Sequence, residues 1–97
     1  MTINGSMVAK GDVTAYSDVR VKSDIEELSP RGELRPVSYT KDGRRGIGFI
    51  AQEVREVYPE LVRKDEDGML SLNYNGLVAV LYAEVQELRQ ALREIKG

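Results

Sequence analysis

The sequence contains neither cysteine nor histidine. Without cysteine there is no disulfide and no thiol nucleophile, and without histidine every Ser-His-Asp or Cys-His mechanism is excluded. The commonest metal ligands are absent for the same reason, so we expect no metal and no cofactor. Lysine and the carboxylates are the only side chains left that could act as a catalytic base.

The sequence also lacks a large excess of one charge and a long apolar run. Its 14 basic residues are dispersed among 16 acidic ones, giving a net charge of −2, whereas proteins that bind nucleic acid usually present a basic face to the phosphates. No apolar run approaches the ~18 to 20 residues that cross a bilayer, and the N-terminus has no signal-peptide core. We therefore expect synthesis in the cytosol and neither a nucleic-acid nor a membrane partner.

The length of 97 residues predicts one small domain with a modest core. A chain of this size buries roughly 60 to 65 per cent of the surface that its unfolded form exposes. With 41% hydrophobic and 31% charged residues, the composition is that of an ordinary globular protein. Association with further copies of the chain is a plausible source of additional burial.

Residues 1–16 differ in character from the rest. They contain short β-favouring pieces broken by Gly5 and Gly11, each beside a turn-forming neighbour. Because such a stub cannot bury a face by itself, we predict that it is the end of a longer fibrous β structure.

The segment after this stub begins with two residues that favour helix N-caps, Ser17 and Asp18. Val21, Ile25 and Leu28 follow at helical spacing, which predicts a short amphipathic helix ending before Pro30. Under this interpretation Ser17 has only a capping role.

The middle of the chain predicts strands, a helix and a hairpin. A strand over 37–40 turns at 41–43, where the glycine suits a left-handed turn position, and a short apolar strand covers 47–50. Helical spacing predicts a helix over 51–57, which a proline stops. A second hairpin follows over 61–73, with its turn at Asp67 and Gly68.

A longer helix is predicted from Asn75 onward, capped by Asn75 or Asn73. Apolar residues recur in it at alternating gaps of three and four, the spacing of a heptad seam. The seam residues are Val78, Leu81, Val85, Leu88, Leu92 and Ile95. A coiled coil and an ordinary amphipathic helix packed on its own domain both fit this pattern. Most of the seam has Val at a and Leu at d, which favours two-stranded coils.

Ser17 and Lys22 lie five residues apart at the boundary after the stub. A lysine activates a serine hydroxyl only when a desolvated or positively charged setting favours its uncharged form. On one regular α-helix the two side chains would point about 140° apart, since each residue turns ~100°. A serine-lysine dyad therefore requires a non-helical segment around Ser17, or a partner residue from a neighbouring chain.

Several stretches together resemble a known family. They are Ser17-Asp18-Val19-Arg20-Val21-Lys22, then Gly48-Phe49-Ile50-Ala51-Gln52-Glu53-Val54, then Tyr58-Pro59-Glu60-Leu61-Val62, then Leu72-Asn73-Tyr74, and finally the heptad helix. In this order, over residues 17–97, they resemble the C-terminal intramolecular chaperone domain of bacteriophage tailspikes, tail fibres and endosialidases. Within the second stretch we interpret Phe49, Ile50 and Val54 as core, and Gln52 and Glu53 as polar contacts within or between subunits.

The resemblance implies a domain that trimerises, aligns the preceding β-stem and then cuts itself off. It implies a cut between Tyr16 and Ser17, with Ser17 as nucleophile and Lys22 as general base. Asp18 would orient Lys22 or Arg20 or cap the helix, with capping the simpler role. Arg20 would either disfavour the charged lysine by repulsion or be an ordinary solvated surface arginine. The oligomer would be a homotrimer whose partners are its own copies and its β-stem. Assembly would take place in the cytoplasm of the bacterial host, with the stem retained on the virion tail and the chaperone released.

The expected fold class is therefore α+β. It comprises a small head of short strands and helices, the stem stub at 1–16, the chaperone domain at 17–97, and within it a helix at 76–96 that forms a parallel trimeric bundle or coiled coil. If activity depends on assembly, making Leu81 and Leu88 polar should leave the bond after Tyr16 intact. The alternative is a permanent trimerisation module in which nothing is cut.

Overall fold

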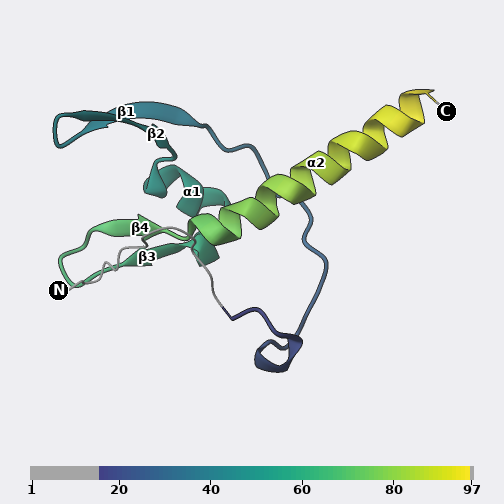
Figure 1. Cartoon of the computed structure of the whole chain (residues 1–97), viewed down its shortest axis with the longest axis horizontal. Helices are drawn as coiled ribbons and strands as arrows, with labels where there is room; N and C mark the ends of the chain where they lie inside the picture. Colours follow the sequence, from purple (N-terminus) through teal and green to yellow (C-terminus); the bar gives the residue numbers. More distant parts are fainter. Residues whose placement is uncertain (1–15, 97) are drawn as a thin grey trace.

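The computed structural model describes residues 16–96, which form two β-hairpins, a short helix and a long C-terminal helix (Figure 1). The elements in chain order are the 3-10 turn η1 (Val19–Val21), strands β1 (Val37–Lys41) and β2 (Arg44–Gly48), helix α1 (Ala51–Val57), the 3-10 turn η2 (Pro59–Leu61), strands β3 (Val62–Lys64) and β4 (Leu70–Leu72), and helix α2 (Tyr74–Lys96). Each hairpin is a separate two-stranded antiparallel sheet. The α+β class expected from the sequence is confirmed, while the stem predicted for residues 1–16 lies, apart from Tyr16, outside the described part of the chain.

A two-residue turn sets the register of the first hairpin. Asp42 and Gly43 have φ values of 52° and 77°, and positive φ at both central positions defines the turn type that matches the twist of paired strands. Lys41 consequently pairs with Arg44, and the ladder runs to the pairing of Val37 with Gly48. The predicted first strand and turn are confirmed, but the second strand begins three residues earlier than expected because pairing resumes directly after the turn.

The predicted helix over 51–57 is confirmed as α1. It ends at Tyr58, whose N–H donates to the carbonyl of Val54 at 2.7 Å, and Pro59 opens the turn η2. The hairpin predicted after it is also confirmed, as β3 and β4. Its turn is wider than expected, because the Asp65 carboxylate accepts the N–H groups of Asp67 and Met69, each at 2.9 Å.

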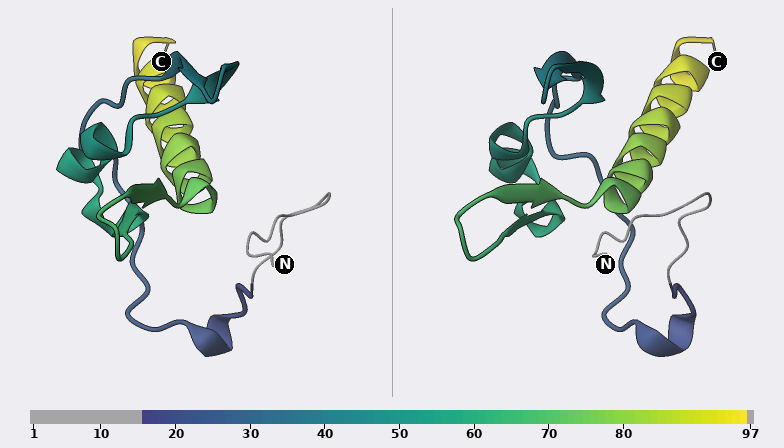
Figure 2. Two further views of the ribbon diagram at one scale, coloured as in Figure 1. Left: turned by 90° about the vertical axis from the view of Figure 1, so that its left-hand side faces the viewer. Right: turned by 60° about the vertical axis from the view of Figure 1, so that its left-hand side comes forward.

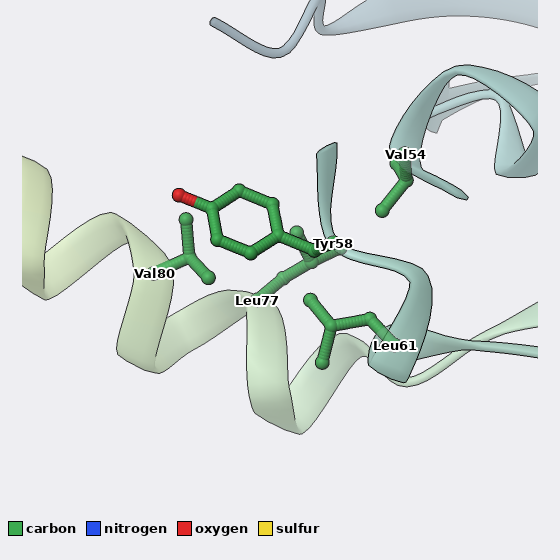
Figure 3. Packing of buried hydrophobic residues seen from close by; sticks show 5 residues of the cluster. All are labelled: Val54, Tyr58, Leu61, Leu77 and Val80. Carbon is green, nitrogen blue, oxygen red and sulfur yellow. The ribbon is translucent and has the colours of Figure 1, made fainter. Parts of the chain in front are cut away.

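The core lies where α1 and η2 meet the first turns of α2 (Figure 3). Val54 and Tyr58 are each only 1% exposed, and the Tyr58 ring lies among the apolar side chains of the facing helix. The core cluster consists of Val54, Tyr58, Leu61, Leu77 and Val80. Val54 has the core position expected for it, Phe49 packs against the cluster half-buried, and Ile50 is half-buried.

Helix α2 has two halves with different surroundings. Its N-terminus is capped by Asn73, whose Oδ1 accepts the N–H of Gly76 at 3.1 Å. In the first half Leu77 and Val80 belong to the core cluster and Ala83 is also buried, whereas residues 86–96 are exposed throughout. The second half projects beyond the rest of the molecule (Figures 1 and 2). None of the helices within residues 16–96 has the length and apolar composition needed to cross a membrane.

The helix predicted after Ser17 is wrong. Only the three-residue turn η1 forms there, and the chain then has no helix or strand until Val37. Val21, Ile25 and Leu28 are 65%, 66% and 39% exposed, so the apolar face of the expected helix has nothing to pack against. Because short helices depend on packing of such a face, spacing alone did not suffice. Asp24 has a φ of 53°, outside the helical region.

Candidate functional site

The candidate site is a hydrogen bond between Ser17 and Lys22, which flank the turn η1. Lys22 Nζ donates to Ser17 Oγ at 2.6 Å. The chain turns once, with the N–H of Val21 bonded to the carbonyl of Asp18 at 3.0 Å, and then leaves in an extended conformation at Lys22. This segment meets the condition derived from the sequence, since its backbone is not an α-helix and both side chains come from one chain.

Asp18, and not Ser17, is the N-cap residue of this segment. Its Oδ1 accepts the backbone N–H of Arg20 at 2.8 Å. The same carboxylate accepts Arg20 Nε at 3.0 Å and Nη2 at 2.9 Å, so the guanidinium engages both oxygens. The hydrogen bonds to Arg20 lower the pKa of Asp18 and raise the pKa of Arg20. The capping role suggested for Ser17 is therefore wrong, and the one suggested for Asp18 is confirmed.

The site is open to solvent in the single chain. Tyr16 is 94% exposed, and Ser17 and Lys22 are also exposed. In this hydrogen bond the amine is the donor, whereas a general base has to accept the serine proton. The geometry of a serine-lysine pair is thus in place, whereas the desolvation that such a pair needs is not supplied by residues 16–96 of one chain.

A cluster around Arg31 connects the site to the head. We call residues 16–30 the site arm; in Figure 1 its purple and blue trace lies away from the core. At the end of this arm the N–H of Arg31 donates to Tyr58 Oη at 2.9 Å. The Arg31 guanidinium binds both carboxylate oxygens of Glu60, at 2.8 and 2.5 Å, and lies 4.9 Å from the centre of the Tyr58 ring. The hydrogen bonds from Arg31, together with a smaller effect of a backbone hydrogen bond at Glu60 itself, lower the pKa of Glu60 to about 2.

Sequence reasoning did not identify the Arg31 cluster. Arg31 precedes a glycine in a segment without periodicity, and nothing local marks its partners 27 and 29 residues away. A second pair joins Arg35 to Glu53, with Nη2 and Oε2 2.5 Å apart. The polar contact expected of Glu53 is therefore made within the chain, and Gln52 is exposed.

The predicted seam residues lie together on α2 and are largely uncovered. Val85 is half-buried, and the exposed fractions of the other five are 65% for Val78, 64% for Leu81, 62% for Leu88, 52% for Leu92 and 81% for Ile95. The face of α2 that packs on the head uses other residues, Leu77, Val80 and Ala83. Beside the seam is an apolar groove of about 620 Å³, lined by Leu34, Pro36 and Phe49 and by residues of α2. The helix thus has an apolar face beyond the one used by its own core.

Comparison with known proteins relates the first part of the described chain to a family. Residues 17–63 match the peptidase S74 family model, described as chaperone of endosialidase. The chain is 50% identical over 42 residues to long tail fiber protein Gp37 of Escherichia phage AR1, covering 41% of this chain and 4% of that protein. It is 38% identical over 72 residues to long tail fiber protein Gp37 of Salmonella phage S16, covering 60% of this chain and 10% of that protein.

The chain therefore spans a tenth or less of the length of these curated relatives. No solved structure gives a significant match. The matched region begins at Ser17 and includes the rest of the site arm, the first hairpin and α1. Over residues 17–63, just under half of its length, this chain is similar to the chaperone of endosialidase family.

Proposed function

We propose that this chain is the assembly chaperone of a phage tail fibre and that it releases itself by cutting the bond between Tyr16 and Ser17. The family match and the two tail fibre relatives support the chaperone role. The observation that carries the proteolytic step is the 2.6 Å hydrogen bond between Lys22 and Ser17, formed by the first residue that the family model matches.

The cut uses the serine next to its own scissile carbonyl. Ser17 Oγ adds to the carbonyl carbon of Tyr16 while its proton passes to an uncharged Lys22 Nζ. The C–N bond then breaks, the Ser17 nitrogen takes the proton back from Lys22, and an ester joins Tyr16 to Ser17 Oγ. Water hydrolyses this ester and leaves a carboxylate on Tyr16 and a free hydroxyl on Ser17. Because nucleophile and carbonyl are covalently linked, no substrate has to be bound.

Assembly supplies the desolvation that the single chain lacks. Ser17 and Lys22 are exposed, and so are Val19 and Val21 between them, at 67% and 65%. A neighbouring copy packed on this apolar turn excludes water from the amine and thereby favours its uncharged form. Cleavage then follows trimer formation, so the chaperone stays attached until three chains are aligned.

The seam of α2 is the surface that brings the chains together. Its residues other than Val85 are exposed in one chain, and the seam continues past the head to Ile95. In the proposed parallel homotrimer these seams pack against one another and hold the three preceding stems in register. Assembly takes place in the host bacterium, and the fibre part stays on the virion after release.

A second candidate is a permanent trimerisation module of the fibre. The exposure of the Ser17–Lys22 pair favours it, because a hydrated ammonium leaves the hydroxyl unactivated. In that case the arm, the head and α2 serve assembly alone.

The mass of the chain after expression with its stem decides between the two. Autoproteolysis predicts a fragment that begins at Ser17, seen by denaturing electrophoresis and intact-mass spectrometry. Ser17→Ala and Lys22→Met should abolish this fragment, whereas Ser23→Ala, which changes another exposed serine of the same arm, should not. A full-length product that is the same for wild type and Ser17→Ala contradicts autoproteolysis and supports the permanent module.

A further inference from the structure

The turn η1 carries two interleaved polar pairs, and the choice of partners in them is informative. Lys22 donates its hydrogen bond to the Ser17 hydroxyl, although a carboxylate is present on Asp18, the residue that follows Ser17. A carboxylate attracts an ammonium by its opposite charge as well as by hydrogen bonding, whereas a hydroxyl offers only the hydrogen bond, so the carboxylate is the more attractive partner for the amine. Something must therefore keep Lys22 from Asp18.

Both oxygens of Asp18 are already engaged by Arg20. Oδ1 accepts the backbone N–H and Nε of Arg20, and Oδ2 accepts Nη2, all between 2.8 and 3.0 Å. We propose that Arg20 is a positioning residue that occupies the Asp18 carboxylate and so leaves the Lys22 amine on the Ser17 hydroxyl. This inference rests on the proposed autoproteolysis and adds a residue to its machinery that touches neither the nucleophile nor the base.

An arginine suits this task better than a lysine would. Its planar fork matches both carboxylate oxygens at once and stays charged at any pH where a lysine amine loses its proton. The lowered pKa of Asp18 and the raised pKa of Arg20, each caused by their hydrogen bonds, act in the same direction. The pair therefore remains ionised and closed under the conditions in which Lys22 has to act as a base.

The pair adds little to the stability of the fold. The Arg20 and Asp18 side chains are 84% and 44% exposed, and exposed ion pairs contribute little because solvent screens them. Apart from Asp18 and Arg20, the charged residue nearest to Lys22 in the sequence is Asp24, two residues further along. Breaking the pair should thus change the site and leave the unfolding midpoint of the protein where it is.

The test follows cleavage of the chain with its stem across pH in a small set of variants. In Arg20→Gln the freed Asp18 carboxylate attracts the Lys22 ammonium, which favours the charged amine and moves the pH midpoint of the cleavage rate upward by about 1 unit. At a pH below both midpoints, the cleavage rate of Arg20→Gln should therefore be about tenfold lower than that of wild type. Adding Asp18→Asn to Arg20→Gln removes the competing carboxylate and should return the midpoint to its wild-type value, because Asn still caps the turn.

The matched control adds Asp24→Asn to Arg20→Gln. It removes one negative charge two residues from Lys22 but leaves Asp18 in place, so the slow rate and high midpoint should persist. If the rate falls equally in Arg20→Gln and in the double variant with Asp18→Asn, with no change of pH midpoint, then the pair merely shapes the turn and the inference is overturned. An Arg20→Gln rate equal to wild type overturns it as well.

A second measurement does not require cleavage. Nuclear Overhauser contacts between the Lys22 ε-protons and the Ser17 β-protons should weaken in Arg20→Gln, with new contacts to the Asp18 β-protons, and should recover when Asp18→Asn is added. If wild type shows these contacts but never cleaves, the proteolytic proposal fails while the positioning of Lys22 by Arg20 stands. If the contacts to Ser17 are unchanged in Arg20→Gln, Arg20 does not position Lys22.

Discussion

Arg31 shows how one side chain fixes the path of a long segment without secondary structure. Its backbone N–H, its two terminal nitrogens and the face of its guanidinium all contact the region from Val57 to Glu60. Tyr58 is buried, so the bond to its hydroxyl joins the end of the site arm to the core itself. The arm is exposed up to residue 29, and its place relative to the head depends on this attachment.

The ion pair between Arg31 and Glu60 predicts a pH-dependent contribution to stability. The pKa of Glu60 is about 2 in the fold, against about 4.3 in an unfolded chain. The contribution of the pair to the free energy of unfolding is complete above about pH 5, where Glu60 is ionised in both states. It is lost as the pH falls through the pKa that Glu60 has in the fold. Because the two side chains are 43% and 54% exposed, screening limits the contribution to about 1 kcal/mol or less.

Urea unfolding of wild type and Glu60→Gln at several pH values measures this contribution. The variant should be less stable at pH 7, and the difference should shrink to near zero at pH 2. Glu56→Gln, which changes an exposed glutamate of α1, is the control and should show no comparable pH dependence. A difference between wild type and Glu60→Gln that is as large at pH 2 as at pH 7 would contradict the assignment.

At the scale of elements, α2 is constrained at its start by close contact with η2. An added Cβ at Gly76 would collide with the δ-methyl of Leu61, which is only 8% exposed. Gly76 therefore allows the first turn of α2 to approach the buried turn η2, at the cost of a poor helix former within the helix.

Gly76→Ala consequently tests packing against helix propensity. Helix propensity alone predicts that alanine raises the free energy of unfolding by about 1 kcal/mol. Overpacking a core contact lowers it by about 1 to 3 kcal/mol. We expect net destabilisation, measured as a lower urea midpoint at a fixed protein concentration. The control Gln90→Ala lies on the exposed half of the same helix and should change stability by no more than about 0.5 kcal/mol. An increased midpoint in Gly76→Ala would show that Leu61 moves aside freely.

At the scale of the whole molecule, the described chain buries little and exposes much. The radius of gyration is 16.5 Å, against about 12 Å for a compact chain of this length. The described residues contain six buried apolar side chains and fourteen exposed large ones. This distribution is expected of a subunit whose further burial comes from copies of itself, and it supports the assembly proposed above.

Replacing Leu88 and Leu92 by glutamine tests this assembly. Both lie beyond the half of α2 that contacts the head, so the fold of the head should be retained. Losing two buried leucines removes roughly 3 to 6 kcal/mol per chain from the proposed interface. Sedimentation or light scattering should show monomer, and the bond after Tyr16 should stay intact.

The control for this variant combines Glu87→Gln with Arg93→Gln. It changes two exposed residues outside the seam and keeps the net charge, so it should assemble and cleave like wild type. A Leu88/Leu92 variant that remains trimeric would show that the seam is not the interface. A monomeric variant that still cleaves rapidly would show that cleavage does not depend on assembly.

Local signals in the sequence determined most of the elements correctly. Asp42 and Gly43 fix a two-residue turn, and Pro59 follows the end of α1, because these residues restrict their own backbone angles. Asn73 caps α2 through its own side chain. The closeness of Ser17 and Lys22 was likewise predictable as a possibility, since five residues of non-helical chain allow the two side chains to meet.

Tertiary structure decided the course of the chain from η1 to β1. The apolar spacing at Val21, Ile25 and Leu28 predicted a helix, but such spacing produces one only where another surface covers the apolar face, and here these residues are exposed. The attachment of Arg31 to Tyr58 and Glu60 joins residues 27 and 29 positions apart. No local pattern encodes that contact, because it exists only after α1 and η2 have folded and brought the tyrosine ring and the carboxylate to the same place.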